Sequence, residues 1–367
     1  MRIFHIVSEG QGVTETDQWP TAPLPGGFYW MACTREELQL HLPRIQSTLQ
    51  HVCGLQLVDL HVSDLLNQHL PSRYDFTSQY DLLVFRRLAS AQTAASSENL
   101  LPEGAKSGPP VLRQIDTSAV GFAVFDQLLL SVHPSDCAVR DAYAARLLQS
   151  TTPEIRHGVS LRVPTSPADL MLRIVSQIVD AFLELRRELT RQIDHWQFEL
   201  LNPRARFQNW STLLDVRLSL HRLDEICEDQ RSAVQDWIDS METWPPASSP
   251  LAQRDRDLLA VRSRDVQEHI ERVVHHVRRL EQSAETTVQM HFSAQGNRTN
   301  DIMRTLTVLT AIFLPLNLIA GIFGMNFEYV PLLRVHAGFY WAMGAMAVIA
   351  VGLTWYFWRK RYLARTR

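Results

Sequence analysis

Two uncharged apolar segments near the C-terminus limit what this chain can fold into more than any other feature. Residues 305–323 read TLTVLTAIFLPLNLIAGIF, residues 337–358 read AGFYWAMGAMAVIAVGLTWYFW, and neither contains Asp, Glu, Lys or Arg. A helix of about 20 apolar residues crosses the ~30 Å hydrocarbon layer of a bilayer. A buried core helix is seldom this long without a charge, so we predict two transmembrane helices.

The charges that flank these segments predict their orientation. The tail 359–367, RKRYLARTR, is strongly basic, and Arg298 and Arg304 precede the first segment. The connecting loop 324–336 contains only Arg334 and Glu328 as charged residues. Because basic residues stay on the cytoplasmic side of a membrane, we expect both termini in the cytoplasm and the loop outside. The predicted location is the inner (plasma) membrane of a bacterium.

Composition excludes several other classes of protein. The net charge is −3 and no long basic block occurs before the tail, so nucleic-acid binding is not expected. The four cysteines lack C-x-x-C spacing, which argues against a zinc ribbon or a disulfide framework. The first residues, MRIFHIVSEGQG, lack the apolar length of a signal peptide. We find no nucleophile elbow, phosphate-binding glycine loop or H-E-x-x-H helix, so no enzymatic activity and no prosthetic group are predicted.

Residues 1–160 mix strand and helix patterns and predict an N-terminal α/β cytoplasmic domain. Short apolar runs bounded by turn residues predict strands at 80–88, 118–126 and 127–133. Residues 34–52 predict a helix that Pro43 interrupts, and residues 96–110 predict a loop rich in Pro, Gly and Ser.

From residue 161 the pattern becomes helical. We predict a cytoplasmic helical region over 161–250, with one helix from Ser166 to Leu201 and another over about 206–240. A single helix is then expected over 251–323, because no proline occurs after Pro250 until Pro315. At 1.5 Å per residue this helix is about 110 Å long, and its last part, 305–323, is the first membrane span. A helix of this length needs partners along its length.

Six residues of the long helix recur at intervals of three and four and share one face. They are Asn300, Met303, Thr307, Thr310, Leu314 and Asn317. Polar groups that face lipid without a partner cost several kcal/mol. The face therefore either lines a water-filled pore or joins helices as polar contacts in a dimer, and the pattern leaves both open. It contains no carboxylate, so as a pore it would offer neutral oxygens, which suit an ion such as Mg²⁺ that keeps its water shell.

The segment RTNDIMRTLTVLTAIFLPLNLIAGIFGMNFEYVP, followed by one more span and a basic tail, resembles the CorA family of divalent-cation transporters. The resemblance is dense over 285–362, looser over 160–284 and only architectural before that. It implies an α+β cytoplasmic domain, a very long pore helix and two C-terminal transmembrane helices, 305–323 and 337–358, assembled as a homopentameric funnel. The expected partners are identical subunits, membrane lipids and divalent cations.

The resemblance also implies roles for individual residues. Gly324, Met325 and Asn326 correspond to the family's selectivity filter in the outer loop 324–336. The family's inner pore positions correspond to the set Asn300, Met303, Leu306, Thr307, Leu314 and Asn317. Mg²⁺ is expected both as the transported ion, with Co²⁺ or Ni²⁺ as further cargo, and as a regulatory ligand between cytoplasmic domains. Asp265 is the candidate regulatory metal ligand, although a solvated surface carboxylate is the plainer interpretation.

Two departures from the CorA pattern bear on ion choice, and the first is Gln289, which stands on the inner side where some family members place an acidic ring. The second is in the outer loop. Leu332 and Leu333 follow Pro331 where CorA-like loops often carry an acidic residue, so Glu328 alone remains to attract cations, opposed by Arg334. The alternative prediction is a Zn²⁺ transporter of the related ZntB branch, possibly coupled to protons. A membrane-anchored scaffold without ion flux is a third hypothesis. His275, His276 and His291 lack metal-ligand spacing and are interpreted as ordinary surface or interface residues.

Overall fold

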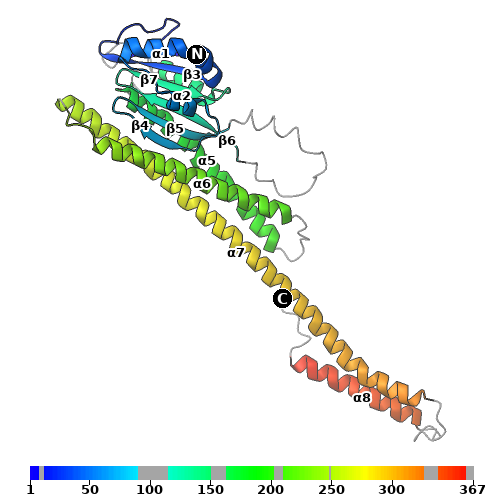
Figure 1. Ribbon diagram of the computed structural model, residues 1–367. Helices are drawn as coiled ribbons and strands as arrows, with labels where there is room; N and C mark the ends of the chain where they lie inside the picture. Colours follow the sequence, from blue (N-terminus) through cyan, green and yellow to red (C-terminus); the bar gives the residue numbers. More distant parts are fainter. Residues whose placement is uncertain are drawn as a thin grey trace. The chain divides into compact units, whose positions relative to one another are not determined.

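The computed structural model describes residues 1–7, 12–89, 115–149, 163–201, 210–247, 249–325 and 338–360. The chain forms two compact units, Met1–Glu285 and Thr286–Arg367. The first unit holds one seven-stranded sheet in the order β2-β1-β3-β7-β6-β5-β4 (Figure 1). Neighbouring strands are antiparallel except β3 and β7, which are parallel. The strands are β1 (Arg2–Val7), β2 (Gly12–Thr16), β3 (Gly27–Thr34), β4 (Arg73–Phe76), β5 (Asp81–Leu88), β6 (Thr117–Val124) and β7 (Leu128–His133).

Each face of the sheet has its own layer of helices. On one face lie α1 (Arg35–Cys53) and α2 (Asp59–Leu66), and on the other α4 (Ala138–Gln149), α5 (Pro167–Leu201) and α6 (Trp210–Glu242). The strands alternate between the two cores, so Trp30 is buried toward one layer and Met31 toward the other. Gly121 lets α2 approach β6 closely, since a Cβ there would lie 2.4 Å from the Cδ2 atom of Leu65.

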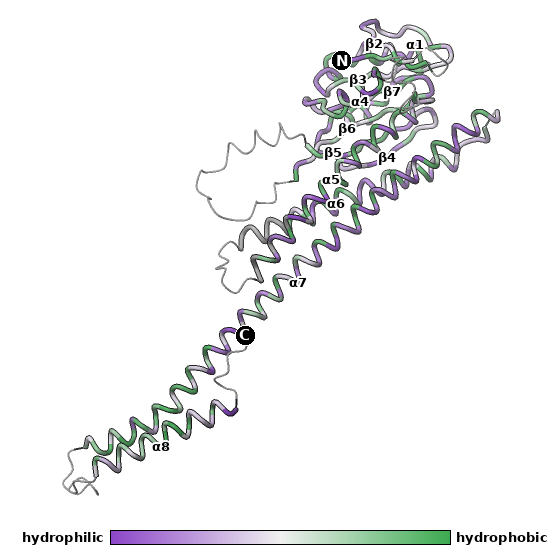
Figure 2. Tube along the Cα trace, turned by 180° about the vertical axis from the view of Figure 1, so that it is seen from behind, coloured by the Kyte–Doolittle hydropathy of each residue, from purple (hydrophilic) through white to green (hydrophobic). Residues whose placement is uncertain are grey.

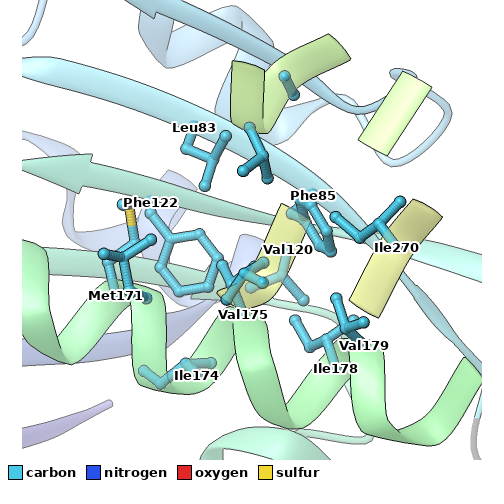
Figure 3. Packing of buried hydrophobic residues seen from close by; sticks show 14 of the residues in the cluster. Leu83, Phe85, Val120, Phe122, Met171, Ile174, Val175, Ile178, Val179 and Ile270 are labelled. Atoms are coloured by element: carbon cyan, nitrogen blue, oxygen red, sulfur yellow. The ribbon is translucent and has the colours of Figure 1, made fainter. Parts of the chain in front are cut away.

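The larger core lies between the sheet, α5 and the long helix α7 (Pro250–Phe323). Figure 3 shows Phe85, Val120 and Phe122 of the sheet among α5 side chains such as Val175, with Ile270 of α7 close to Phe85. These side chains are fully or almost fully buried. The sheet, α5 and the first part of α7 therefore share one hydrophobic core.

Several predicted elements are confirmed. Strands β5, β6 and β7 coincide with the three predicted strands within two residues at each end. The side chain of Ser166 accepts a hydrogen bond from the backbone N–H of Asp169 at 3.1 Å, which caps α5 as predicted. The single long helix is present as α7, with Pro315 inside it.

Two further predictions concern the helix break at Pro43 and the loop 96–110. The predicted break at Pro43 is wrong, because α1 continues through that residue to Cys53. Proline removes one helical hydrogen bond, but Pro43 and Gln39, whose carbonyl it leaves without that bond, are both exposed to water. The buried face of α1, with residues such as Leu38 and Ile45, holds the helix in place. The predicted loop 96–110 lies outside the described residues.

In the second unit, the end of α7 is accompanied by α8 (Gly338–Arg359). Figure 2 shows that both helices are predominantly hydrophobic here and run alongside each other. Both are long and apolar enough to cross a membrane. Only 6% of the most apolar stretch of α7 and 11% of that of α8 are buried. A core helix of a soluble protein would be mostly buried, so the low burial favours the membrane interpretation.

Candidate ion pathway

The predicted polar face of α7 is exposed over its whole length. Asn300, Thr307, Thr310 and Asn317 are all exposed, and the apolar members of the set are exposed too, Met303 by 57% and Leu314 by 69%. Leu306, which the family resemblance adds, is 55% exposed. Within the chain the structure therefore presents these seven side chains outward, as either a pore lining or a helix–helix interface requires.

The two threonines on this face present their oxygens in a specific way. The hydroxyl of Thr307 donates to the backbone oxygen of Met303 at 2.8 Å, and the hydroxyl of Thr310 donates to that of Leu306 at 2.8 Å. A hydroxyl whose hydrogen is used in this way keeps only its lone pairs for outside partners. Both oxygens are therefore acceptors, which favours a cation or its water shell over an anion.

The two asparagines behave differently from the threonines. Neither Asn300 nor Asn317 has a side-chain hydrogen-bond partner among the residues that the structure describes. Their amides are exposed and so available to water, to an ion's hydration shell or to another subunit.

The opposite side of α7 is the covered one within the second unit. Val308 is 2% exposed, and residues 311, 312, 315, 316, 319 and 323 are half-buried. Ala342, Met346, Ile349 and Leu353 form the matching half-buried side of α8. At 100° per residue, the mean direction of the covered side of α7 lies about 150° from the mean direction of the six residues of the polar face. We infer that α8 packs behind α7 and leaves the polar face uncovered.

At the C-terminal end of α7 the structure describes only part of the predicted filter. Gly324 donates its N–H to the oxygen of Ala320 at 2.9 Å and Met325 donates to that of Ile322 at 3.3 Å, so the chain is still turning helically there. A Cβ at Gly324 would lie 3.0 Å from the Ala320 oxygen, which favours glycine. Met325 is 52% exposed. Asn326 and Glu328 lie outside the described residues.

The exposed neutral face extends further toward the N-terminus than the sequence analysis recognised. Gln289, Ser293 and Gly296 continue the same count of three and four below Asn300, and all are exposed. The interval of three and four was the available signal for Ser293 and Gly296, whereas Gln289 was predicted only to occupy the place of an acidic ring in some CorA-like proteins.

The candidate regulatory residue Asp265 does not belong to a complete metal site among the described residues. The Asp265 side chain is 58% exposed, and its Oδ1 atom lies 3.8 Å from Nε2 of His269, one turn along α7. Among the residues that the structure describes, no group of three or more His, Cys, Asp or Glu side chains could hold a metal ion. His276 contacts the Thr190 hydroxyl of α5 at 2.7 Å and accepts from Arg279 at 2.8 Å. Burial and the Arg186 and Arg279 charges lower the pKa of His276, which agrees with its interpretation as an ordinary contact residue.

Sequence reasoning also missed the connection between α7 and the sheet domain. The carboxylate of Asp169, at the start of α5, pairs with Arg262 of α7 at 2.5 Å and with Arg173 at 2.9 Å. It also accepts from the backbone N–H of Thr165 at 3.2 Å. Asp169 is 7% exposed, so this carboxylate fixes α7 to the sheet domain from a nearly buried position.

Comparison with known proteins supports the fold described above. A family model described as CorA-like Mg²⁺ transporter protein matches residues 25–361. The cobalt/magnesium transport protein CorA of Thermotoga maritima is 28% identical over 200 residues, which cover 53% of this chain and 52% of that protein. The chain therefore aligns with about half the length of this relative.

Two solved structures share the fold. The complete structure of the CorA magnesium transporter from Methanocaldococcus jannaschii matches with a TM-score of 0.69 at 19% identity, over 98% of both chains. The full-length CmaX protein matches with a TM-score of 0.64 at 17% identity, over 98% of this chain and 97% of that one. The family consists of transporters rather than enzymes. Because its model matches nearly the whole chain, this protein belongs to the CorA-like Mg²⁺ transporter protein family.

Proposed function

We propose that this chain is one subunit of a homopentameric channel that carries divalent cations, chiefly Mg²⁺, into the bacterial cytoplasm. The observation that carries the proposal is the exposed, uncharged face of α7, which contains Asn300 and, within the apolar segment 305–323, Thr307, Thr310 and Asn317. Membership of the CorA-like family supports it. Several copies of α7 that turn this face toward a common axis would surround a water-filled path.

The chemistry of the face suits an ion that keeps its hydration shell. Mg²⁺ loses water reluctantly, and the water molecules around it donate hydrogen bonds outward. Acceptor oxygens on Thr307 and Thr310, with the amide oxygens of Asn300 and Asn317, would receive those bonds. Met303 and Leu314 alternate with the polar residues and would form apolar constrictions that close by dewetting.

The outer filter completes the proposed path. Asn326 amides from five subunits would form a neutral collar that captures the hydrated ion, with Glu328 attracting cations to the loop. The membrane potential supplies about 2.3 kcal/mol per charge per 100 mV, and roughly twice that for a divalent ion. Uptake would then need no ATP. Mg²⁺ held at Asp265 between neighbouring subunits would regulate the channel when the internal concentration is high.

Reconstitution tests this function directly. The full-length protein in liposomes loaded with a Mg²⁺-sensitive dye should admit Mg²⁺ when the interior is made negative, and Asn326→Ala should abolish most of that influx. Thr305→Val is a control off the polar face, because Thr305 lies on α7 two residues, or 200°, from Thr307, and its hydroxyl donates to the backbone oxygen of Asp301 as that of Thr307 does to Met303. Equal influx through wild type and Asn326→Ala would refute the filter role.

The same liposomes separate the alternatives. The outer loop has few acidic residues, because Leu332 and Leu333 follow Pro331, and this feature favours the Zn²⁺ alternative. Zn²⁺ influx that depends on a pH gradient, without Mg²⁺ influx, would support a ZntB-like transporter. No flux of any divalent cation would support a scaffold whose polar helix face only joins subunits.

A further inference from the structure

A cluster of buried hydrogen-bond donors lies at one edge of the sheet, far along the sequence from the proposed ion path. Strands β3, β5 and β7 end at this edge and β6 begins there. Arg87 of β5 pairs in register with Ser118 of β6, and His133 of β7 pairs with Thr34 of β3. Arg35 follows Thr34 as the first residue of α1. The topology thus brings Arg35, Arg87, Ser118 and His133 to one place.

All four of these residues have a buried polar atom without a hydrogen-bond partner. The atoms are Nε of Arg35, Nε of Arg87, Oγ of Ser118 and Nδ1 of His133. They are four of nine such atoms in the part of the chain that the structure describes. His133 is 0% exposed and Arg87 is 3% exposed. A buried donor without a partner destabilises the folded state, so several of them at one place indicate that a bound group satisfies them.

The surrounding network indicates that these atoms are donors. The Trp30 indole N–H donates to Oγ of Ser131 at 2.8 Å, and Nε2 of His133 lies 2.9 Å from the same oxygen. In the tautomer in which Ser131 donates its hydroxyl hydrogen to Nε2, the indole N–H, the Ser131 hydroxyl and Nε2 are all satisfied and the proton of His133 is on Nδ1. The two guanidinium Nε–H groups can only donate. With His133 assigned to that tautomer, the unsatisfied set consists of three N–H donors and one hydroxyl.

Positive charge dominates around this set. Besides burial, the charges of Arg140, Arg87 and Arg35 act on His133 and lower its pKa, and the charge of Asp141 opposes them. Asp136 pairs with Arg87, and Asp141 pairs with Arg140 at 2.9 Å. The electrostatic neighbours of Arg35 are Arg86 and Arg87, and its terminal nitrogen donates to the backbone oxygen of Ala119. The Arg35 guanidinium thus has no carboxylate partner in the described part of the chain.

We infer that this edge of the sheet binds a small oxyanion of the phosphate class, held by Arg35, Arg87, Ser118 and His133. Guanidinium, imidazole and hydroxyl groups are the donors that bind phosphate oxygens, and the ion would neutralise the surplus charge of Arg35. The N-terminus of α1 at Arg35 adds a favourable dipole, although Glu36 and Glu37 in its first turn reduce that contribution. The complete burial of His133 selects a small free ion over a bulky nucleotide.

Titration of the full-length protein in detergent with inorganic phosphate tests the inference. Affinity is measured by calorimetry at neutral pH and constant ionic strength, with chloride as the reference salt. Arg35→Gln should weaken phosphate binding about ten-fold or more, which corresponds to at least 1.4 kcal/mol. Arg44→Gln is the matched control, because Arg44 lies on the exposed side of α1 and its guanidinium packs over the Trp19 ring. That variant should bind phosphate like the wild type.

A second variant and comparisons with chloride and ATP complete the test. If Arg35→Gln does not fold, Ser118→Ala removes a single hydroxyl and should weaken phosphate binding several-fold. Heat of binding that is indistinguishable between phosphate and chloride would overturn the inference, since water would then suffice for the buried donors. Equal loss in Arg35→Gln and Arg44→Gln would overturn it as well, as would binding of ATP without binding of free phosphate. Divalent-cation flux is not a readout here, so the result is independent of the proposed channel function.

Discussion

The unit Met1–Glu285, here called the sheet domain, buries its apolar residues, whereas the unit Thr286–Arg367, here called the membrane unit, exposes the same residue types. Phe122 on β6 is completely buried, whereas Phe313 on α7 is 53% exposed. Leu83 of β5 is 2% exposed, and Leu314 of α7 is 69% exposed. The difference follows from the solvent that each unit requires, because water drives apolar side chains inward and a lipid bilayer does not. An apolar pattern therefore has structural meaning only once the surrounding medium is known.

Polar groups show the complementary contrast. In the sheet domain the buried carboxylate of Asp169 is satisfied by two local partners, Arg173 and the backbone N–H of Thr165, and by the distant guanidinium of Arg262 on α7. In the membrane unit, Thr307, Thr310 and Thr354 satisfy their hydroxyl hydrogens on their own helix, four residues back. A helix that leaves water needs its hydrogen bonds to be local, whereas a domain folded around a water-excluded core can use distant partners.

The strongest test of this contrast replaces the same residue type in both units. Phe122→Ala should destabilise the sheet domain by about 3–5 kcal/mol, because it opens a cavity in the core. Phe313→Ala should leave the unfolding of that domain unchanged. Urea unfolding of the full-length protein in detergent, followed by tryptophan fluorescence, measures both variants. Similar shifts in the two variants would show that the units do not differ in this way.

The buried Asp169 pair provides the second test. Asp169→Asn should cost about 2 kcal/mol, because two guanidinium groups lose their carboxylate. Glu184→Gln, on the same helix, removes one partner of an ion pair whose side chains are 66% and 71% exposed and should cost about 0.5 kcal/mol or less. The same urea experiment compares them. If Glu184→Gln costs as much as Asp169→Asn, burial is not what gives the Asp169 pair its strength.

A pH titration tests how burial in the sheet domain affects His133. Burial, together with the Arg140, Arg87 and Arg35 charges, lowers the pKa of His133 from 6.5 to about 3. The unfolded chain binds a proton there below pH 6.5 and the folded one does not, so stability falls as the pH falls through that window. The slope from this residue is about 1.4 kcal/mol per pH unit. His133→Gln should flatten the stability curve of the full-length protein between these pH values, and parallel curves would contradict the assignment.

The smallest expected effect concerns the polar face of α7. Thr310→Val removes one acceptor oxygen from each subunit and should lower Mg²⁺ influx into liposomes about three-fold to ten-fold, which is at most ~1.4 kcal/mol. Thr305→Val, off this face, should leave influx unchanged. Circular dichroism checks that both variants remain helical. Loss of influx in Thr305→Val alone would place the water-filled path on another side of the helix.

The sequence by itself determined the helical and membrane character of the C-terminal half. Uncharged length predicts spans 305–323 and 337–358, and the interval of three and four predicts the shared face of Asn300, Thr307 and Asn317, because helix geometry is local. Strands at 80–88, 118–126 and 127–133 were recognisable for the same reason, as short apolar runs between turns. Strand β3 was not, since its six central residues are buried on both faces and no alternation marks them.

Only the tertiary structure decided how distant residues meet. The parallel pairing of β3 with β7, the pairing of Asp169 with Arg262 and the donor cluster around His133 join residues that lie far apart along the chain. Such contacts depend on the sheet order and on which helix covers which face, and no local interval in the sequence encodes them. The polar face of α7 was predictable because one helix carries all of it, whereas the sheet-edge cluster needs four strands and α1 to exist.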